Sequence, residues 1–419
     1  MTSIGGVEMV DWKLAVTTAS RLARPGPEIT REEAREVVAE LRGHAVAAEE
    51  HVRAFTGMTT AAAEEHVRAF TGMTTAAGHD TPVLVVDRPG WIEANVAGFR
   101  SLLKPLMTKM RARRGNGPGG MIAGAVGGKV TGVELGVLLS FLSSRVLGQY
   151  ETFAPATREL PGAPDGGGRL LLVAPNIVHV ERELGVDPHD FRLWVCLHEE
   201  THRTQFTAVP WLRDHLEAEI QAFLAETDVD AGTLLERLSD AVQAFTGGRR
   251  GESAEPSATG TATDTDTAPE TEPGARSGAH APEQDIDGRS LVDLVQTPAQ
   301  REILARVTAV MSLLEGHADY VMDGVGPQIV PSVVEIREKF QRRRAAGANR
   351  LDQILRRLLG LDAKLRQYRD GERFVRAVVE EVGMEGFNRV WTSPNTLPTP
   401  AEITHPAEWI ARVHRGPEA

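Results

Sequence analysis

Apolar residues recur every three to four positions along most of the chain, which is the period of an α-helix. Two short runs break this period: residues 83–87 (VLVVD) and 169–174 (RLLLVA) are almost continuously apolar and are followed by turn-forming residues. Such runs are typical of buried β-strands. We therefore predict a mainly α-helical fold with a small β-sheet, and helices over residues 91–106, 211–226, 234–245, 298–323, 331–344, 351–368 and 372–382.

Small residues form a second pattern, because they recur at every fourth position from Gly120 to Gly136 and then at Ser140, Ser144 and Gly148. On a helix, such positions form one ridge that lets a neighbouring backbone approach closely. Close packing has to offset the cost of each interior glycine, which is about 0.5–1 kcal/mol relative to alanine. We interpret the ridge as core architecture, since it lacks the spacing of a phosphate-binding loop.

The fifteen-residue segment AEEHVRAFTGMTTAA occurs twice in succession, at residues 48–62 and 63–77. We predict that one copy packs in a helical region and that the other is surplus, because stacked repeat arrays contain many diverged units. Residues 247–287 have almost no large apolar side chain, which predicts a disordered insertion. We expect a helical N-terminal region (1–80), a core in two parts (81–246 and 288–345) around the insertion (247–287), and a helical C-terminal region (346–419).

The formal net charge of -12 argues against a nucleic-acid-binding surface. The basic run 342–344 lies beside acids and is interpreted as a solvated helix face. Glu134 and Arg145 interrupt the most apolar stretch, which is then too short to span a membrane. The lone cysteine, Cys196, excludes an internal disulfide, and no signal peptide is evident. We expect a cytoplasmic protein with neither nucleic-acid nor membrane partners; its oligomeric state stays open.

His198, Glu199 and His202 form the pattern HExxH, inside a helix predicted to begin at Pro188 with Asp187 as N-cap. Residues four apart project from the same face of a helix, so both imidazoles can bind one metal ion. Glu199 is then placed to act as general base toward water. The pattern predicts Zn²⁺ as cofactor.

A catalytic zinc usually has three protein ligands, and we select Glu315 as the third. It lies late in a helix predicted to begin with a capping box at Thr297 and Gln300. Asp319 follows four residues later on the same face, where it can accept the outer N–H of a zinc-bound histidine.

His317 competes with Glu315 for the ligand role, since imidazole also binds zinc. Two positions along a helix separate the two side chains by about 160°, so both can be ligands only if the helix breaks at Gly316. His317 and Tyr320 are also candidates for polarising a substrate carbonyl. The alternative is that they pack and form hydrogen bonds beside the site.

Together, an HExxH helix and an ExxxD helix are similar to the gluzincin arrangement, and longer words resemble the zincin-like metallopeptidase type 2 family. The segments that carry the resemblance are DRPGWIEAN (87–95), VLGQY (146–150), LLLVAPNI (170–177), FRLWVCLHEETHRTQF (191–206), PWLR (210–213) and SLLEGHADYVMDG (312–324). The resemblance implies a zincin core, a bound zinc and hydrolase or peptidase activity, carried onto His198, Glu199, His202 and Glu315. Some members are labelled as associated with biosynthesis of a deazaflavin coenzyme, a label that indicates co-occurrence more than chemistry.

We therefore expect a zinc-dependent metallohydrolase, with amide-bond hydrolysis of a peptide as the leading reaction. The edge of the LLLVA strand is a candidate for aligning an extended peptide by strand addition. Two alternatives stay open. One is a zinc-binding scaffold without turnover, and the other is a hydrolase of a small-molecule amide or ester, which a narrow closed pocket would favour.

Overall fold

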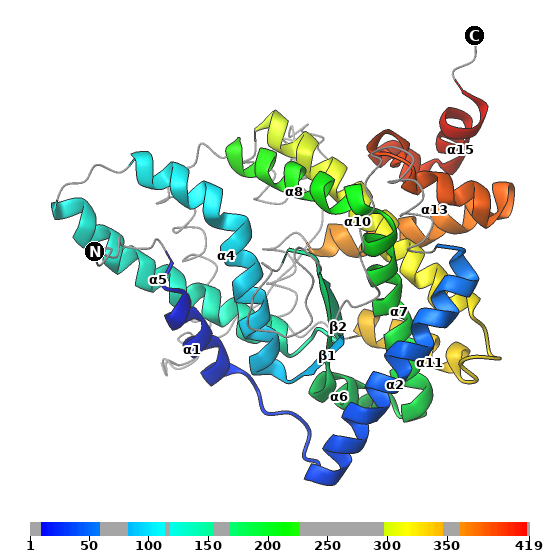
Figure 1. Ribbon diagram of the computed structural model, residues 1–419, viewed down its shortest axis with the longest axis horizontal. Helices are drawn as coiled ribbons and strands as arrows, with labels where there is room; N and C mark the ends of the chain where they lie inside the picture. The colour runs from blue at the N-terminus through cyan, green and yellow to red at the C-terminus, as the bar shows by residue number, and fades with distance from the viewer. Residues whose placement is uncertain are drawn as a thin grey trace, which may run out of the picture.

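The computed structural model describes residues 10–58, 83–113, 118–153, 168–226, 297–346 and 361–416. Most of this part of the chain is helical, as predicted (Figure 1). The longer helices are α1 (Trp12–Leu22), α2 (Arg31–Thr56), α4 (Arg88–Arg113), α5 (Pro118–Ser143), α6 (Ala174–Leu184), α7 (Pro188–Ala208), α8 (Pro210–Ala225), α10 (Pro298–Gly324), α11 (Val333–Ala346) and α13 (Leu361–Phe387). The C-terminal residues form η1 (Asn388–Trp391), η2 (Pro394–Thr396), α14 (Pro400–Thr404), α15 (Pro406–Ile410) and η3 (Ala411–Arg415).

Three sequence predictions lie outside the described residues: the helix 234–245, the insertion 247–287 and the second repeat copy 63–77. The predicted helix 351–368 is described from residue 361 onward, where it continues into α13. The sequence pattern does not predict helix α6, because Pro175 directly follows an apolar run, where proline is typical of a turn. In the structure, Pro175 lies in the first turn of α6.

Strands β1 (Val83–Val86), β2 (Gly148–Glu151) and β3 (Arg169–Val173) form one sheet in the order β1-β3-β2. β1 pairs with β3 in parallel and β2 pairs with it antiparallel. The predicted strand at residues 169–174 is therefore central, so the expectation that its edge could align a peptide is wrong. In the described part of the chain, β1 and β2 are the outer strands of the sheet, one on each side of β3. The short, polar sequence of β2, GQYE, gave no strand signal.

The sheet separates two apolar clusters, since successive side chains of a strand point to opposite faces. Leu172 packs with apolar side chains of α2, α6 and α7, whereas Leu171 and Val173 pack with those of α1, α4 and α5. Figure 1 shows α4 and α5 on one side of the sheet and α2, α6 and α7 on the other. A third cluster joins α8, α10, α13 and the C-terminal helices.

Helix α1 lies against the glycine ridge of α5. A Cβ atom added at Gly132 would lie 2.6 Å from the carbonyl oxygen of Asp11, and one at Gly136 would also lie 2.6 Å from an α1 atom. Both distances are shorter than van der Waals contact, so the predicted close approach is confirmed at these two positions. The ridge prediction is wrong at Gly148, because α5 ends before it and Gly148 begins β2.

Residues 48–56 of the first repeat copy form the C-terminal part of α2, as predicted for a copy that packs in a helical region. Its residues Ala48, Val52 and Thr56 are buried. They lie on the side of α2 that packs against α7, so the repeat contributes to the support of the HExxH helix.

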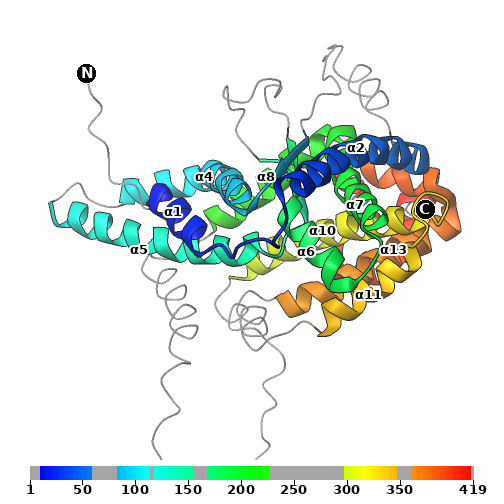
Figure 2. The same cartoon turned by 90° about the horizontal axis from the view of Figure 1, so that it is seen from below.

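Local signals fix both helices of the expected metal centre. Asp187 caps α7 by accepting the backbone N–H of Asp190, and Thr297 caps α10 in a capping box with Gln300. Figure 2 shows α10 between α7 and α13. A Cβ atom at Gly316 would lie 2.1 Å from the α13 backbone, so the glycine permits this close crossing. Helix α10 continues through it without a break.

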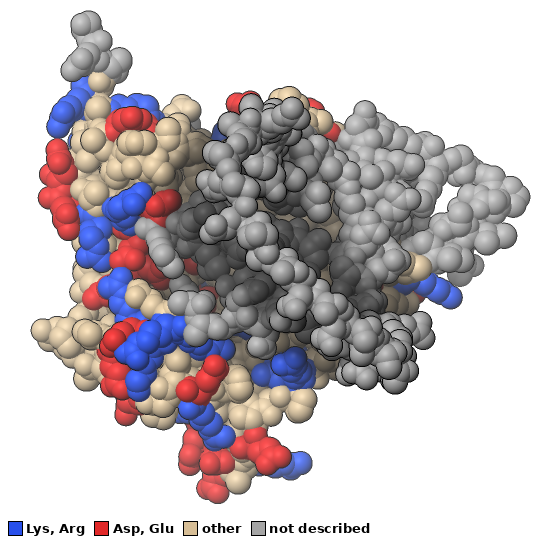
Figure 3. All heavy atoms as spheres, turned by 180° about the vertical axis from the view of Figure 1, so that it is seen from behind, with Lys and Arg blue, Asp and Glu red and all other residues tan. Residues whose placement is uncertain are grey.

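Acidic and basic side chains are interspersed over the described part of the face shown in Figure 3. On α11, Arg342 pairs with Glu338 and Arg343 pairs with Glu183 of α6, as expected for a solvated helix face. None of the described helices is long and apolar enough to cross a membrane.

Candidate metal centre

His198 and His202 project from one face of α7 toward Glu315 of α10. Their Nε2 atoms lie 3.2 Å apart. Glu315 Oε2 lies 3.7 Å from Nε2 of His198, and Oε1 lies 3.6 Å from Nε2 of His202. The fold thus brings together the three residues predicted as ligands, although α7 and α10 are far apart in the sequence. We refer to them as the ligand trio.

The spacing of these atoms fits a zinc ion. Tetrahedral zinc with bonds of about 2.0–2.1 Å holds its ligand atoms about 3.3 Å apart. The three separations in the ligand trio, 3.2, 3.6 and 3.7 Å, are close to that value. Two imidazole nitrogens with one carboxylate are also a donor set that catalytic zinc uses. The ligand trio can therefore hold zinc with small side-chain adjustments.

The outer nitrogen of His202 is held by Gln205. Nδ1 of His202 lies 3.0 Å from Oε1 of this side chain. The amide nitrogen of Gln205 donates to the carbonyl oxygen of Leu314 at 2.9 Å and lies 3.0 Å from Nδ1 of His317. These two acceptors use both amide hydrogens of Gln205, so its Oε1 atom is an acceptor toward His202. His202 therefore donates its Nδ1–H to Gln205, and the Nε2 atom of His202 is the nitrogen that is available to a metal.

Gln205 was missed by sequence reasoning, although a signal was present. It follows His202 by three residues, a spacing that places both side chains on the same face of a helix. On the other histidine, Oδ1 of Asp319 lies 3.8 Å from Nδ1 of His198. The structure therefore places the predicted carboxylate beside the outer nitrogen of His198.

Glu199 is buried, with 6% of its surface exposed. Burial raises the pKa of its carboxyl to about 8; His202 opposes this shift and Glu315 adds to it. A divalent cation nearby would lower the pKa again, because positive charge favours the carboxylate. The carboxyl is therefore able to exchange a proton near neutral pH.

Gly148 makes room for this carboxyl. A Cβ atom on Gly148 would lie 2.5 Å from Cγ and 2.8 Å from Oε1 of Glu199. Both residues line a cavity of about 460 Å³ together with the ligand trio, residues 149–153 and side chains of α4 and α8. Gly148 is a second residue that sequence reasoning missed, since it was assigned to the helical ridge.

Strand β2 passes the ligand trio with one backbone edge turned away from β3. The N–H of Val173 donates to the carbonyl oxygen of Leu147 at 2.8 Å. Hydrogen-bonded pairs alternate in an antiparallel ladder, so Gly148 and Tyr150 direct their backbone N–H and C=O groups to the opposite edge. Tyr150 also stacks on Phe206 of α7, with ring centroids 5.6 Å apart.

His317 and Tyr320 do not line this cavity. His317 is fully buried, with its ring 5.3 Å from that of Phe387 and 5.4 Å from that of Trp391. Burial lowers the pKa of His317 to about 3, and His202 adds to the shift. The ring of Tyr320 lies 6.0 Å from that of Phe55. Both residues pack beside the site, as in the alternative interpretation, and His317 also accepts a hydrogen bond from Gln205. His317 supplies no atom to the ligand trio.

Comparisons with known proteins indicate the family and the reaction class. Among solved structures, the chain is similar to a protein from Chloroflexus aurantiacus described as a "putative hydrolase with a novel fold". The two are 28% identical over 98% of this chain and 100% of that chain, with a TM-score of 0.58. No curated protein matches the chain. The family model for a zincin-like metallopeptidase matches residues 10–410, which implies a divalent metal, typically zinc, and supports a hydrolase. Because that match spans nearly the whole chain, the protein belongs to the zincin-like metallopeptidase family.

Proposed function

We propose that the protein is a zinc-dependent peptidase in which the ligand trio holds the ion and Glu199 is the general base. The observation that carries the proposal is the convergence of two imidazole nitrogens and the carboxylate of Glu315, with separations of 3.2 to 3.7 Å, at the wall of a cavity that Glu199 also lines. Membership of a metallopeptidase family supports the same reaction class.

A zinc ion in the ligand trio supplies Lewis acidity that activates water and polarises a carbonyl group. The carboxylate of Glu199 accepts a proton from the attacking water and can deliver it to the leaving nitrogen. Burial supports this second role, because a carboxyl whose pKa is raised toward neutrality releases and holds a proton with similar ease. Gly148 leaves room for the carboxyl in this position, because it has no side chain at the contact.

The neighbouring side chains position the histidines. Gln205 fixes the tautomer of His202 through its Oε1 atom, and Asp319 lies beside the outer nitrogen of His198. Such partners hold a ligating imidazole in one orientation, and their loss typically costs about 10- to 100-fold in metal affinity or activity.

The outer edge of β2 favours an extended peptide as substrate. The backbone groups of Gly148 and Tyr150 can pair with a peptide laid along the strand, and pockets beside a strand select alternate side chains. Apolar side chains supply much of the adjoining wall: Phe99, Leu102, Phe153, Phe206, Leu216 and Met311. We therefore expect cleavage next to an apolar residue.

The test is a peptide-library cleavage assay with products mapped by mass spectrometry. Glu199→Gln should keep zinc and lose turnover by about 10²- to 10⁴-fold, the usual contribution of a general base. Glu302→Gln makes the same chemical change at an exposed site on α10 and should leave the rate unchanged. Parent-level cleavage by Glu199→Gln would overturn the proposed mechanism, and a zinc-loaded parent that cleaves no peptide would overturn the proposed substrate class.

A further inference from the structure

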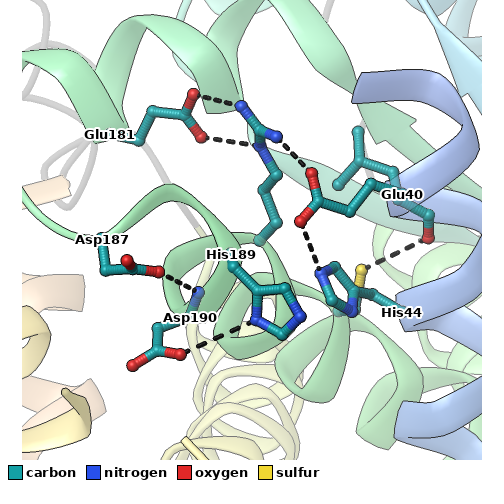
Figure 4. Close-up of polar contacts among 9 residues, drawn as sticks. Glu40, His44, Glu181, Asp187, His189 and Asp190 are labelled. Carbon is teal, nitrogen blue, oxygen red and sulfur yellow. Dashed lines mark hydrogen bonds and ion pairs between the residues drawn. The ribbon is translucent and has the colours of Figure 1, made fainter. Parts of the chain in front are cut away.

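A second group of potential metal ligands lies at the N-terminal end of α7, away from the ligand trio near the middle of that helix (Figure 4). Glu40 and His44 are four residues apart on α2, and His189 is in the first turn of α7. One ligand atom from each lies within 4.8 Å of the other two. Nine residues separate His189 from His198, which is about 13 Å along a helix, so this group is separate from the ligand trio. We refer to it as the α2–α7 cluster.

The geometry within the α2–α7 cluster suits a shared ion. Nε2 of His44 lies 3.3 Å from Oε1 of Glu40, which is close to the separation of about 3.3 Å between two ligand atoms on tetrahedral zinc. The rings of His44 and His189 meet edge to face, with centroids 4.5 Å apart and planes at 89°. His44 is 8% exposed, so an ion bound to it would be largely shielded from solvent on that side.

Arg192 holds the carboxylate of Glu40 through the oxygen that does not face His44. Arg192 donates to Oε2 of Glu40, and its Nε and Nη2 atoms donate to Glu181 at 2.9 and 2.6 Å. This arrangement, visible in Figure 4, leaves Oε1 of Glu40 directed at His44. Orientation of a ligating carboxylate by further hydrogen bonds is a regular feature of metal sites.

A carboxylate also lies beside the exposed histidine, His189. Oδ1 of Asp190 lies 3.8 Å from Nδ1 of His189. The other carboxylate oxygen of Asp190 accepts hydrogen bonds from the backbone N–H and the Oγ of Ser332, at 2.7 and 2.6 Å. A carboxylate beside one imidazole nitrogen favours the tautomer that leaves the other nitrogen free to bind a metal.

The charge balance also favours a cation. Three carboxylates, from Glu40, Glu181 and Asp190, surround the guanidinium of Arg192 and the two imidazoles. Asp187 adds a fourth carboxylate at the same end of α7, so negative charge is in excess over the one guanidinium, and this excess favours a bound cation.

The geometry points to a second metal-binding site, formed by Glu40, His44 and His189, that takes a divalent transition ion such as zinc and ties α2 to the first turn of α7. Two imidazoles with one carboxylate select zinc, cobalt, nickel or copper over magnesium or calcium. The cluster lies outside the cavity of the ligand trio, so its ion stabilises the packing of the HExxH helix and does not take part in hydrolysis.

A neighbouring group, Asp187, His189 and Asp190, offers another set of ligand atoms within 4.8 Å. It has one imidazole and two carboxylates and two of its three residues, Asp187 and His189, are exposed, whereas the α2–α7 cluster has two imidazoles, which transition ions prefer. The ion is therefore assigned to the side of His189 that faces α2.

The test is zinc stoichiometry by native mass spectrometry and calorimetric titration of the full chain, stripped with a chelator and titrated with zinc alone. The parent should bind two ions. His189→Ala should bind one, and so should His202→Ala, because each removes a ligand from a different site. The double variant should bind none. His179→Ala removes an exposed histidine of α6 outside both groups and should still bind two.

His189 is the chosen position because its side chain is 65% exposed, so the variant keeps the fold. In His202→Ala, zinc should still raise the melting temperature by mass action on the remaining site, and that rise should vanish when His189→Ala is added. A parent that binds one ion, or a His189→Ala variant that still binds two, would overturn the second site. Failure of the ligand trio would appear separately, as unchanged stoichiometry in His202→Ala.

Discussion

Two places along α7, one near its middle and one at its N-terminal end, contribute to the same donor set of two histidines and one glutamate, in different surroundings. The ligand trio borders a cavity that also holds Glu199 and the outer edge of β2. The α2–α7 cluster lies outside that cavity, and the buried carboxylates beside it, those of Glu181 and Asp190, accept hydrogen bonds from Arg192 and Ser332. The comparison teaches that the ligand set selects the metal, while the neighbouring base, the cavity and the strand edge decide whether hydrolysis is possible.

The surroundings also predict different affinities. The ligand trio has a neutral amide, Gln205, and a carboxylate, Asp319, behind its histidines. In the α2–α7 cluster the guanidinium of Arg192 lies on the glutamate itself and repels a cation. We therefore expect the ligand trio to bind zinc more tightly, so that its ion is the last to leave during titration with a chelator.

The largest effect should come from His202→Ala. The change removes a ligand of the catalytic ion, so turnover should be lost together with one zinc per chain, while the ion of the α2–α7 cluster stays. Zinc analysis and the cleavage assay on the same sample would measure both, with His179→Ala as the matched control. Turnover at the parent's level in His202→Ala would show that the trio is not the catalytic centre.

Gly148→Ala should have the second largest effect, because the added methyl group would overlap the carboxyl of Glu199. Displacing a reacting group by about 1 Å can cost on the order of 10² in rate, so we expect a fall in kcat of that size with zinc content unchanged. Gly43→Ala adds the same methyl group to open space on α2 and serves as control. An unchanged kcat in Gly148→Ala would contradict this role of Gly148, because Glu199 would then act as a base equally well from another position in the cavity.

Asp319→Ala should weaken zinc binding at the ligand trio by about 10- to 100-fold, since it removes the carboxylate beside the outer nitrogen of His198. Competition with a chelator would measure the loss most clearly in a His189→Ala background, where one site remains. Asp214→Ala, at an exposed position of α8, is the control. Equal zinc affinities in Asp319→Ala and the control would leave this carboxylate without a role in holding the metal.

The smallest effect on catalysis should come from His189→Ala. Surface substitutions away from a site usually change free energies by about 0.5 kcal/mol or less, so kcat should stay within about twofold of the parent. The melting temperature in excess zinc should nevertheless fall, because one stabilising ion is lost. A large drop in kcat would indicate that the α2–α7 cluster controls the chemistry as well as the packing.

Local sequence signals were sufficient for the helices that carry the ligand trio. Asp187 with Pro188, and Thr297 with Gln300, mark the first turns of α7 and α10, and the structure confirms both caps. The i,i+4 spacing then determines which side chains share a face. Such signals act within one turn of helix, so they can be read without knowing the fold.

Features that depend on distant contacts were not predicted. Strand β2 exists because its polar residues pair with β3, and Gly148 owes its role to the carboxyl of Glu199 in a different helix. Glu40 and His189 are separated by most of the first half of the chain and meet because α2 packs on α7. Gln205 is the exception, since its spacing from His202 was visible in the sequence.

The central claim is that the ligand trio binds zinc, and anomalous diffraction at the zinc edge from crystals of the zinc-loaded protein tests it most directly. We predict a peak about 2.0–2.1 Å from Nε2 of His198, Nε2 of His202 and a carboxylate oxygen of Glu315. A map with no peak between these three atoms, including one with zinc bound at the α2–α7 cluster alone, would contradict the claim.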